Sequence, residues 1–167
     1  MPQIWLSLGT NVGDREQNLE RALLALPGVG VVTAVSPVYE TKAWGMAGQP
    51  DFLNMCAAAT TNLTPRPLLT ALKIIERELG REPGLHWGPR LIDIDILFYN
   101  DLVYQDDQLT IPHPLLASRA FVLVPLADIA PELVHPNTNQ TIHELLTQVD
   151  QKSVQLYRRL TPVQTED

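Results

Sequence analysis

The segment Trp87-Gly88-Pro89-Arg90-Leu91-Ile92-Asp93-Ile94-Asp95 places a rigid turn and a cation just ahead of two acids. Because successive side chains of a β-strand point to opposite faces, Asp93 and Asp95 share one face while Ile92, Ile94 and Ile96 share the other. Carboxylates two residues apart on a strand lie about 7 Å apart at their backbones and can converge on hard cations such as Mg²⁺. A half-buried strand with a polar outer face is the alternative, and an isolated pair of aspartates leaves both readings open.

The residues before this strand alternate between strand and helix patterns. Residues 3–8, 31–39 and 52–61 are predicted to be strands from their alternating or β-branched side chains, and the second is expected to be interrupted near its end by Pro37. A first helix is predicted from an Asp14 cap to Pro27, and a second from Thr64-Pro65 to Gly80. Together with the aspartate strand, the order βαββαβ predicts an α+β fold with a ferredoxin-like core, an antiparallel sheet with both helices packed on one face.

The rest of the chain is expected to complete a single domain. Residues 101–110 favour a short hairpin or meander, 115–128 and 141–149 favour helices, and 154–158 favour a late edge strand. A chain of 167 residues suits one domain with a real core. We expect that domain to span residues 1–161, with 162–167 as a flexible C-terminal tail.

Composition narrows the classes of partner. The formal charge of −7 argues against binding a nucleic acid, because a phosphate polymer would be repelled. Cys56 is the single cysteine, so it cannot form an internal disulfide, and its apolar neighbours predict a buried, inert thiol. There is no apolar stretch near the ~18 residues of a membrane span and no secretion signal, so a cytoplasmic protein is expected.

The segment around the aspartates resembles the signature of the 6-hydroxymethyl-7,8-dihydropterin pyrophosphokinase family. Only His86, where the family usually has arginine, departs from it. Further blocks follow in the family's order and near its spacing: Gly9-Thr10-Asn11 with Gly13-Asp14, Gln49-Pro50-Asp51-Phe52-Leu53-Asn54, Ile111-Pro112-His113-Pro114 and Arg119-Ala120-Phe121.

The resemblance implies transfer of pyrophosphate from ATP to the hydroxymethyl oxygen of the pterin, leaving AMP. It implies that Asp93 and Asp95 are the metal ligands of two Mg²⁺ ions, and that the catalytic cations are Arg81, Arg90 and Arg119. Guanidinium groups suit this task because they stay charged and fork onto two phosphate oxygens. A surface salt bridge is the alternative for each arginine. Relatives often have a second arginine after Arg81, where this chain has Glu82-Pro83, so loop closure is expected to be weaker or differently assembled.

The same resemblance implies candidate binding residues for both substrates. For ATP these are Lys73, Glu76, Arg90, Ile96, Thr110, His113 and Arg119. A backbone-bonded structural histidine is the alternative for His113, and an exposed ion pair is the alternative for Lys73 with Glu76.

For the pterin the candidates are Thr41, Trp44, Phe52, Asn54 and Phe121. A flat heteroaromatic ring requires stacking faces and an amide that reads its polar edge, and Asn54 follows Phe52 on the same strand face. A plain core role is the alternative for either phenylalanine. Lys42-Ala43 replaces the proline usual in the loop before Trp44, and Gly9 and Asn11 are interpreted as determinants of the fold more than as ligands.

Two other functions compete with this reading. A metal-dependent phosphohydrolase would use the aspartates with water as nucleophile, but it would not need a stacking cleft. A ferredoxin-like regulatory module would bind nucleotide without catalysis. The pyrophosphokinase reading predicts ATP and the pterin as partners of a monomer.

Overall fold

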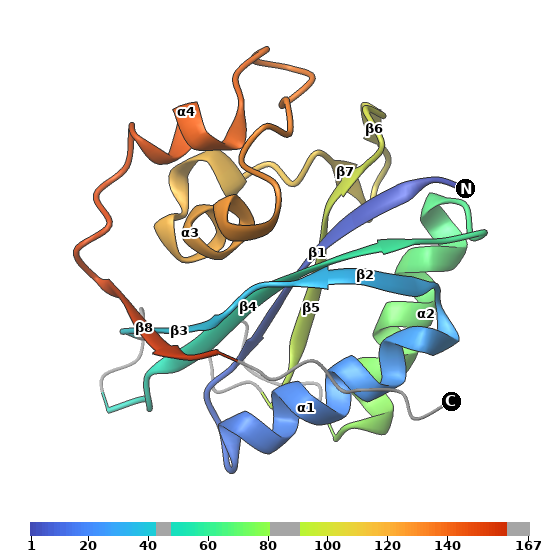
Figure 1. The fold of residues 1–167 in the computed structure, drawn as a ribbon. Coiled ribbons are helices and arrows are strands. Elements are labelled where there is room, and N and C mark those ends of the chain that lie inside the picture. Colours follow the sequence, from blue (N-terminus) through green and yellow to red (C-terminus); the bar gives the residue numbers. More distant parts are fainter. Residues whose placement is uncertain (43–47, 81–90, 160–167) are drawn as a thin grey trace.

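The structure is a computed structural model that describes residues 1–42, 48–80 and 91–159. It confirms an α+β architecture in which helices pack on an antiparallel sheet (Figure 1). The expected C-terminal tail, residues 162–167, lies outside the described residues.

The central sheet has the strand order β5-β1-β4-β3-β8, and β2 pairs with the same edge of β4 as β3 does. All of its pairings are antiparallel. The strands are β1 (Gln3–Thr10), β2 (Val31–Val35), β3 (Val38–Thr41), β4 (Phe52–Thr60), β5 (Asp93–Tyr99) and β8 (Val154–Arg158). The strand that carries the aspartates therefore lies at one edge of the sheet, beside β1.

Helices cover both faces of this sheet (Figure 1). Helices α1 (Arg15–Ala25) and α2 (Pro65–Glu78) share one face, as predicted, and bury a core with Leu6, Leu8 and Ile94. Helices α3 (Ala120–Ile129) and α4 (Ile142–Leu146) cover the opposite face and pack on a second core. Shorter elements connect them: η1 (Leu26–Gly28), β6 (Tyr104–Gln105), β7 (Thr110–Ile111) and η2 (Leu116–Ser118).

Cap chemistry explains where the first two helices begin. The Asp14 side chain accepts a hydrogen bond from the Gln17 amide at 3.1 Å, which caps α1 as predicted. Thr64 stands at the N-cap of α2, but its hydroxyl makes no capping hydrogen bond, contrary to the expectation of a good cap. Pro65 supplies the start instead, since its fixed φ suits a first helical position that needs no N–H.

One predicted boundary is confirmed and two are wrong. The interruption predicted at Pro37 divides residues 31–39 into β2 and β3, because proline has no N–H for the ladder. The preceding Ser36 stays attached to β4 through its amide, which donates to the Cys56 carbonyl at 2.9 Å. The helices expected at 115–128 and 141–149 begin later or end earlier, at 120–129 and 142–146.

The alternation of β5 holds only as far as Ile96. The register against β1 shifts beyond that residue, and both Leu97 and Phe98 then pack into the core beneath α3. Such an irregularity re-aims the backbone. Here the freed Leu97 carbonyl accepts a hydrogen bond from the His113 amide at 3.0 Å, which ties a predicted site residue to β5.

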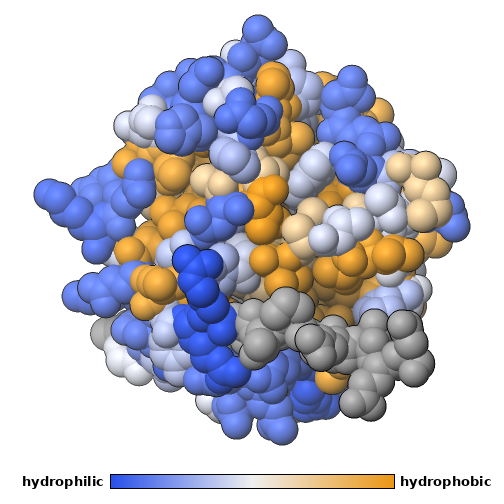
Figure 2. All heavy atoms as spheres, in the orientation of Figure 1, coloured by the Kyte–Doolittle hydropathy of each residue, from blue (hydrophilic) through white to orange (hydrophobic). Residues whose placement is uncertain are grey.

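Cys56 is fully buried, as predicted, and burial raises the pKa of its thiol. Figure 2 shows hydrophobic residues gathered over β2 and its neighbours, with hydrophilic residues around the margin. Within the described ranges, we find no helix with the length and apolar character that a membrane span requires.

Gly30, which precedes β2, offers a test of this packing. A Cβ built there would lie 2.2 Å from the Thr60 carbonyl oxygen, whereas a Cβ on Gly28 would meet nothing within 4 Å. We expect Gly30→Ala to lower the free energy of unfolding by about 1–3 kcal/mol, because backbone must move to admit the methyl group. Gly28→Ala, the matched control, should be close to neutral in urea denaturation. Equal midpoints for both variants would contradict the close approach of β2 to β4.

Candidate functional site

Asp93 and Asp95 lie on the same face of β5, and both are half-buried. The intervening Ile94 is fully buried on the other face, toward α2. The alternation expected from the sequence is therefore present where the acids stand. Their face is the one covered farther along the sheet by α3.

A row of residues crosses the sheet from the acids to the predicted pterin residues. Gly9 of β1 pairs with Asp93 on one side and with Asn54 of β4 on the other. A Cβ on Gly9 would lie 2.9 Å from the Asn54 Oδ1, so only glycine lets the amide occupy this position without a shift. Gly9, predicted to matter mainly for the fold, thus also sets the spacing between the two halves of the site.

Glu76 is not part of an exposed ion pair, which was the alternative reading for it. Its side chain is 2% exposed, and its Oε1 accepts a hydrogen bond from the Ile94 amide at 2.7 Å. Lys73 lies one helical turn earlier, and its Nζ is 3.2 Å from the same oxygen. Glu76 therefore fastens the outer edge of β5 to α2, between the two aspartates along the strand.

Burial and the neighbouring carboxylates together shift the pKa of Asp95. Desolvation, the charge of Asp93 and the charge of Glu76 raise the pKa of Asp95 to about 7, although Lys73 and Arg119 act in the opposite direction. A carboxyl group with this pKa is only partly ionised near neutrality in the free protein. A bound cation would favour the ionised form.

A cavity of about 350 Å³ opens beside the acids. It gathers five of the predicted residues: Lys73, Asp95, Ile96, Thr110 and His113. The other residues that line the cavity, among them Leu69, Gln108 and Leu109, were not predicted from the sequence. Leu69 stands one turn before Lys73 on α2, a spacing that places both on one helix face and that would have revealed it.

His113 is held in a defined protonation state. Burial, with help from the positive charge of Arg119, lowers the pKa of His113 to about 4, so the ring is neutral at pH 7. Its Nδ1 accepts a hydrogen bond from the Leu115 amide at 3.2 Å. The proton of the neutral ring therefore resides on Nε2, which is left as a donor at the cavity.

Arg119 precedes α3, and its guanidinium lies 5.5 Å from the centre of the Phe121 ring. Within the described part of the chain it has no carboxylate at ion-pair distance, yet its charge influences both Asp95 and His113. A half-buried arginine of this kind is well suited to an anionic ligand.

Three of the predicted pterin residues, Thr41, Phe52 and Asn54, lie together at the other end of the row. Asn54 is buried, and its Nδ2 donates to the Thr41 hydroxyl at 3.0 Å. Phe52 pairs with Thr41 across β3 and β4 and remains half-buried. The Asn11 amide holds the adjoining loop by donating to the Gln49 side chain at 3.0 Å and to the Pro50 carbonyl at 3.2 Å, which agrees with a role in the fold.

The remaining predicted site residues, Arg81, Arg90 and Trp44, lie outside the described residues. Among the described residues no group of three or more histidine, cysteine or acidic side chains is arranged to hold a metal ion. Asp93 and Asp95 supply two carboxylates. That number fits Mg²⁺, which usually takes one or two carboxylates and completes its shell with substrate phosphates and water.

Comparison with known proteins places these features in a family. Residues 5–131 match the family model described as 7,8-dihydro-6-hydroxymethylpterin-pyrophosphokinase (HPPK). A 2-amino-4-hydroxy-6-hydroxymethyldihydropteridine pyrophosphokinase from Aquifex aeolicus is 42% identical over 144 residues, which cover 86% of this chain and 90% of the relative. The similarly named protein from Methylorubrum extorquens is 44% identical over 158 residues, covering 93% and 98% of the two chains.

Solved structures agree at the level of the fold. A Plasmodium falciparum HPPK-DHPS triple mutant superposes with a TM-score of 0.72 at 21% identity, covering 88% of this chain and 44% of that one. This chain thus spans less than half the length of that protein. The extent of the family match and the identity to full-length relatives show that the chain belongs to the 7,8-dihydro-6-hydroxymethylpterin-pyrophosphokinase family.

Proposed function

We propose that this protein transfers the pyrophosphoryl group of ATP to 6-hydroxymethyl-7,8-dihydropterin in folate synthesis. The hydroxymethyl oxygen attacks the β-phosphorus and loses its proton to solvent, the bond from that phosphorus to the α-phosphate bridging oxygen breaks, and AMP leaves. The observation that carries the proposal is the row Asn54–Gly9–Asp93, which joins a ring-binding pocket to an acidic pair across one strand.

Positioning and electrostatics provide most of the catalysis in reactions of this class. The cavity beside Lys73, Thr110 and His113 would hold the nucleotide. The neutral His113 would donate its Nε2 proton to a phosphate oxygen, and Arg119 would neutralise charge on the transferred group. Arg90, and Arg81 from the segment 81–89, are proposed to complete the set of cations.

Asp93 and Asp95 are proposed to hold two Mg²⁺ ions that bind with ATP. Such ions would neutralise the triphosphate and polarise the phosphorus under attack. The acids are suited to this because they share a face and, in Asp95, carry a repulsion that a cation relieves. Glu76 is proposed to contribute to ATP binding by holding β5 in position, since its carboxylate accepts a hydrogen bond from the Ile94 amide.

The pterin would stack between Phe52 and Phe121. The Asn54 amide, held by Thr41, would read the polar edge of the ring. Trp44 is proposed to close this pocket. Because Gly9 has no side chain, the hydroxymethyl arm would have a clear path toward Asp93.

The core topology, the oligomeric state and the location of the protein are also proposed. The strand order and the two helices on one face support a ferredoxin-like core. We further propose a cytoplasmic monomer with one domain over residues 1–161.

The direct test is product analysis. We expect protein, ATP, Mg²⁺ and hydroxymethyl-dihydropterin to yield AMP and a pterin diphosphate in equal amounts by mass spectrometry. Omission of the pterin should leave ATP intact, whereas phosphate or pyrophosphate release under that condition would establish a hydrolase instead. Nucleotide binding without either product would indicate a regulatory module.

Asp95→Asn should stabilise the metal-free protein at pH 8. The raised pKa means that the folded state binds this proton more tightly than the unfolded chain, so its contribution to stability is lost as pH rises through about 7. Removal of even about 1 kcal/mol of repulsion would raise the Tm by about 2–4 °C. The gain should shrink toward pH 4, and Mg²⁺ with nucleotide should stabilise the wild type more than the variant.

Asp101→Asn, at an exposed position, is the matched control and should leave the Tm unchanged. A Tm for Asp95→Asn at or below that of the wild type at pH 8 without metal would contradict the repulsion. Turnover should fall by orders of magnitude in Asp95→Asn and stay normal in Asp101→Asn.

Phe121→Ala should weaken pterin affinity by about 1–3 kcal/mol, because stacking on an aromatic face contributes this much. ATP affinity should change less, although Arg119 loses the ring that it contacts. Phe121→Tyr, which keeps the ring, should bind the pterin almost normally. Isothermal titration with each ligand measures both effects, and equal losses for ATP and pterin would exclude the stacking role.

A further inference from the structure

One wall of the cavity is a hairpin loop, residues 106–109, between β6 and β7. The Asp106 amide donates to the Leu109 carbonyl at 2.9 Å. In return, the Asp106 Oδ1 accepts from the amides of Gln108 at 2.7 Å and Leu109 at 2.8 Å. The shape of this wall therefore depends on a single carboxylate.

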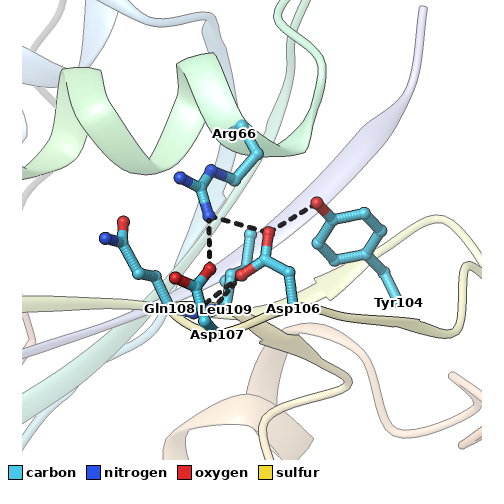
Figure 3. Close-up of polar contacts among 6 residues, drawn as sticks. All are labelled: Arg66, Tyr104, Asp106, Asp107, Gln108 and Leu109. Carbon is cyan, nitrogen blue, oxygen red and sulfur yellow. Dashed lines mark hydrogen bonds and ion pairs between the residues drawn. The ribbon is translucent and has the colours of Figure 1, made fainter.

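The second oxygen of that carboxylate links the loop to α2. The Asp106 Oδ2 accepts hydrogen bonds from the Tyr104 hydroxyl at 2.6 Å and from the Arg66 Nη1 at 2.8 Å (Figure 3). The same Arg66 nitrogen lies 3.5 Å from the Asp107 Oδ1. The hydrogen bonds from Tyr104, the loop amides and Arg66 hold the pKa of Asp106 well below its usual range, so the carboxylate stays charged.

Arg66 begins the face of α2 that forms the opposite wall. Leu69 and Lys73, three and seven residues later, lie on the same face and line the cavity. A cation in the first turn of a helix is disfavoured by the helix dipole. The ion pair with Asp106 offsets that penalty, and it joins the two walls of the cavity.

We propose that Arg66 is a positioning residue that fixes the spacing between α2 and the loop 106–109 and thereby sets the affinity for ATP. The inference rests on the proposed nucleotide-binding role of the cavity. Arg66 is absent from the cavity lining, so it acts through Asp106 and without contact to the nucleotide. The pterin pocket lies across β1, so its ligand should not respond to Arg66.

The test separates KM from kcat. We expect Arg66→Gln to raise KM for ATP by a factor of about 1.4 to 5, the range for loss of an exposed ion pair. The kcat and the KM for pterin should stay unchanged, and Arg66→Lys should recover part of the loss. Arg158→Gln is the matched control, because Arg158 forms an exposed ion pair with Glu16 on another part of the surface.

Asp106→Asn provides the second arm. Asparagine keeps an oxygen for the two loop amides but weakens the bond to Arg66, so KM for ATP should rise by a similar factor. The double variant should show no further rise, since both changes remove one interaction.

The inference is overturned if Arg66→Gln leaves KM for ATP unchanged or raises KM for both substrates equally. It is also overturned if the rises in KM for ATP caused by Arg66→Gln and Asp106→Asn add together in the double variant. Tighter ATP binding by Asp106→Asn would overturn it as well, because that result would mean that Asp106 affects ATP only through the repulsion of its negative charge. Titration with a non-hydrolysable ATP analogue and Mg²⁺ distinguishes the two levels of failure. Absence of binding to the wild type would refute the proposed function, whereas equal binding to wild type and Arg66→Gln would refute only the positioning role.

Discussion

The pairing of β1 with β4 on one side and β5 on the other is the constraint on which the site depends. Hydrogen-bonded strands have a fixed separation, so the register Asn54–Gly9–Asp93 sets the distance from the Asn54 amide, the proposed reader of the pterin edge, to the acidic pair. A slip of one residue in either pairing would turn the acids or the amide to the other face. The alternating leucines and isoleucines of β1 and β5 oppose such a slip. A slip would expose these side chains, which are buried in the core that the sheet forms with α1 and α2.

Repulsion among neighbouring carboxylates in the free protein is the second feature that connects structure with function. Asp93, Asp95 and Glu76 stand close together, and the nearby cations Lys73 and Arg119 do not cancel their effect on Asp95. A sequence selected only for stability would not gather acids in this way. The proposed cations would make the arrangement favourable by binding there with the nucleotide, and this would couple ligand binding to folding stability through the same carboxylates.

Much of the fold and the position of the two aspartates could be predicted from the sequence, because both depend on patterns within single elements. The alternation of side chains in a strand predicted that Asp93 and Asp95 share one face. The helical spacing of apolar residues, bounded by proline and glycine, predicted where α1 and α2 lie in the chain. The family resemblance rested on short blocks near the residues now found along the row and around the cavity.

Other features required knowledge of contacts between distant segments. The burial of Glu76 depends on the Ile94 amide of the edge strand, which donates a hydrogen bond to its carboxylate, and the register shift near Leu97 depends on how β5 meets β1. Likewise, the role of Arg66 depends on a loop 40 residues farther along the chain. No periodicity within a single element reveals such partners.

The central claim is that Asp93 and Asp95 hold the ions on which pyrophosphoryl transfer depends. A crystal structure with Mg²⁺, a non-hydrolysable ATP analogue and hydroxymethyl-dihydropterin tests it most directly. The account predicts an ion about 2.0–2.1 Å from oxygens of both carboxylates, with the hydroxymethyl oxygen aligned on the β-phosphorus. A ternary complex in which both carboxylates face away from any ion would contradict it.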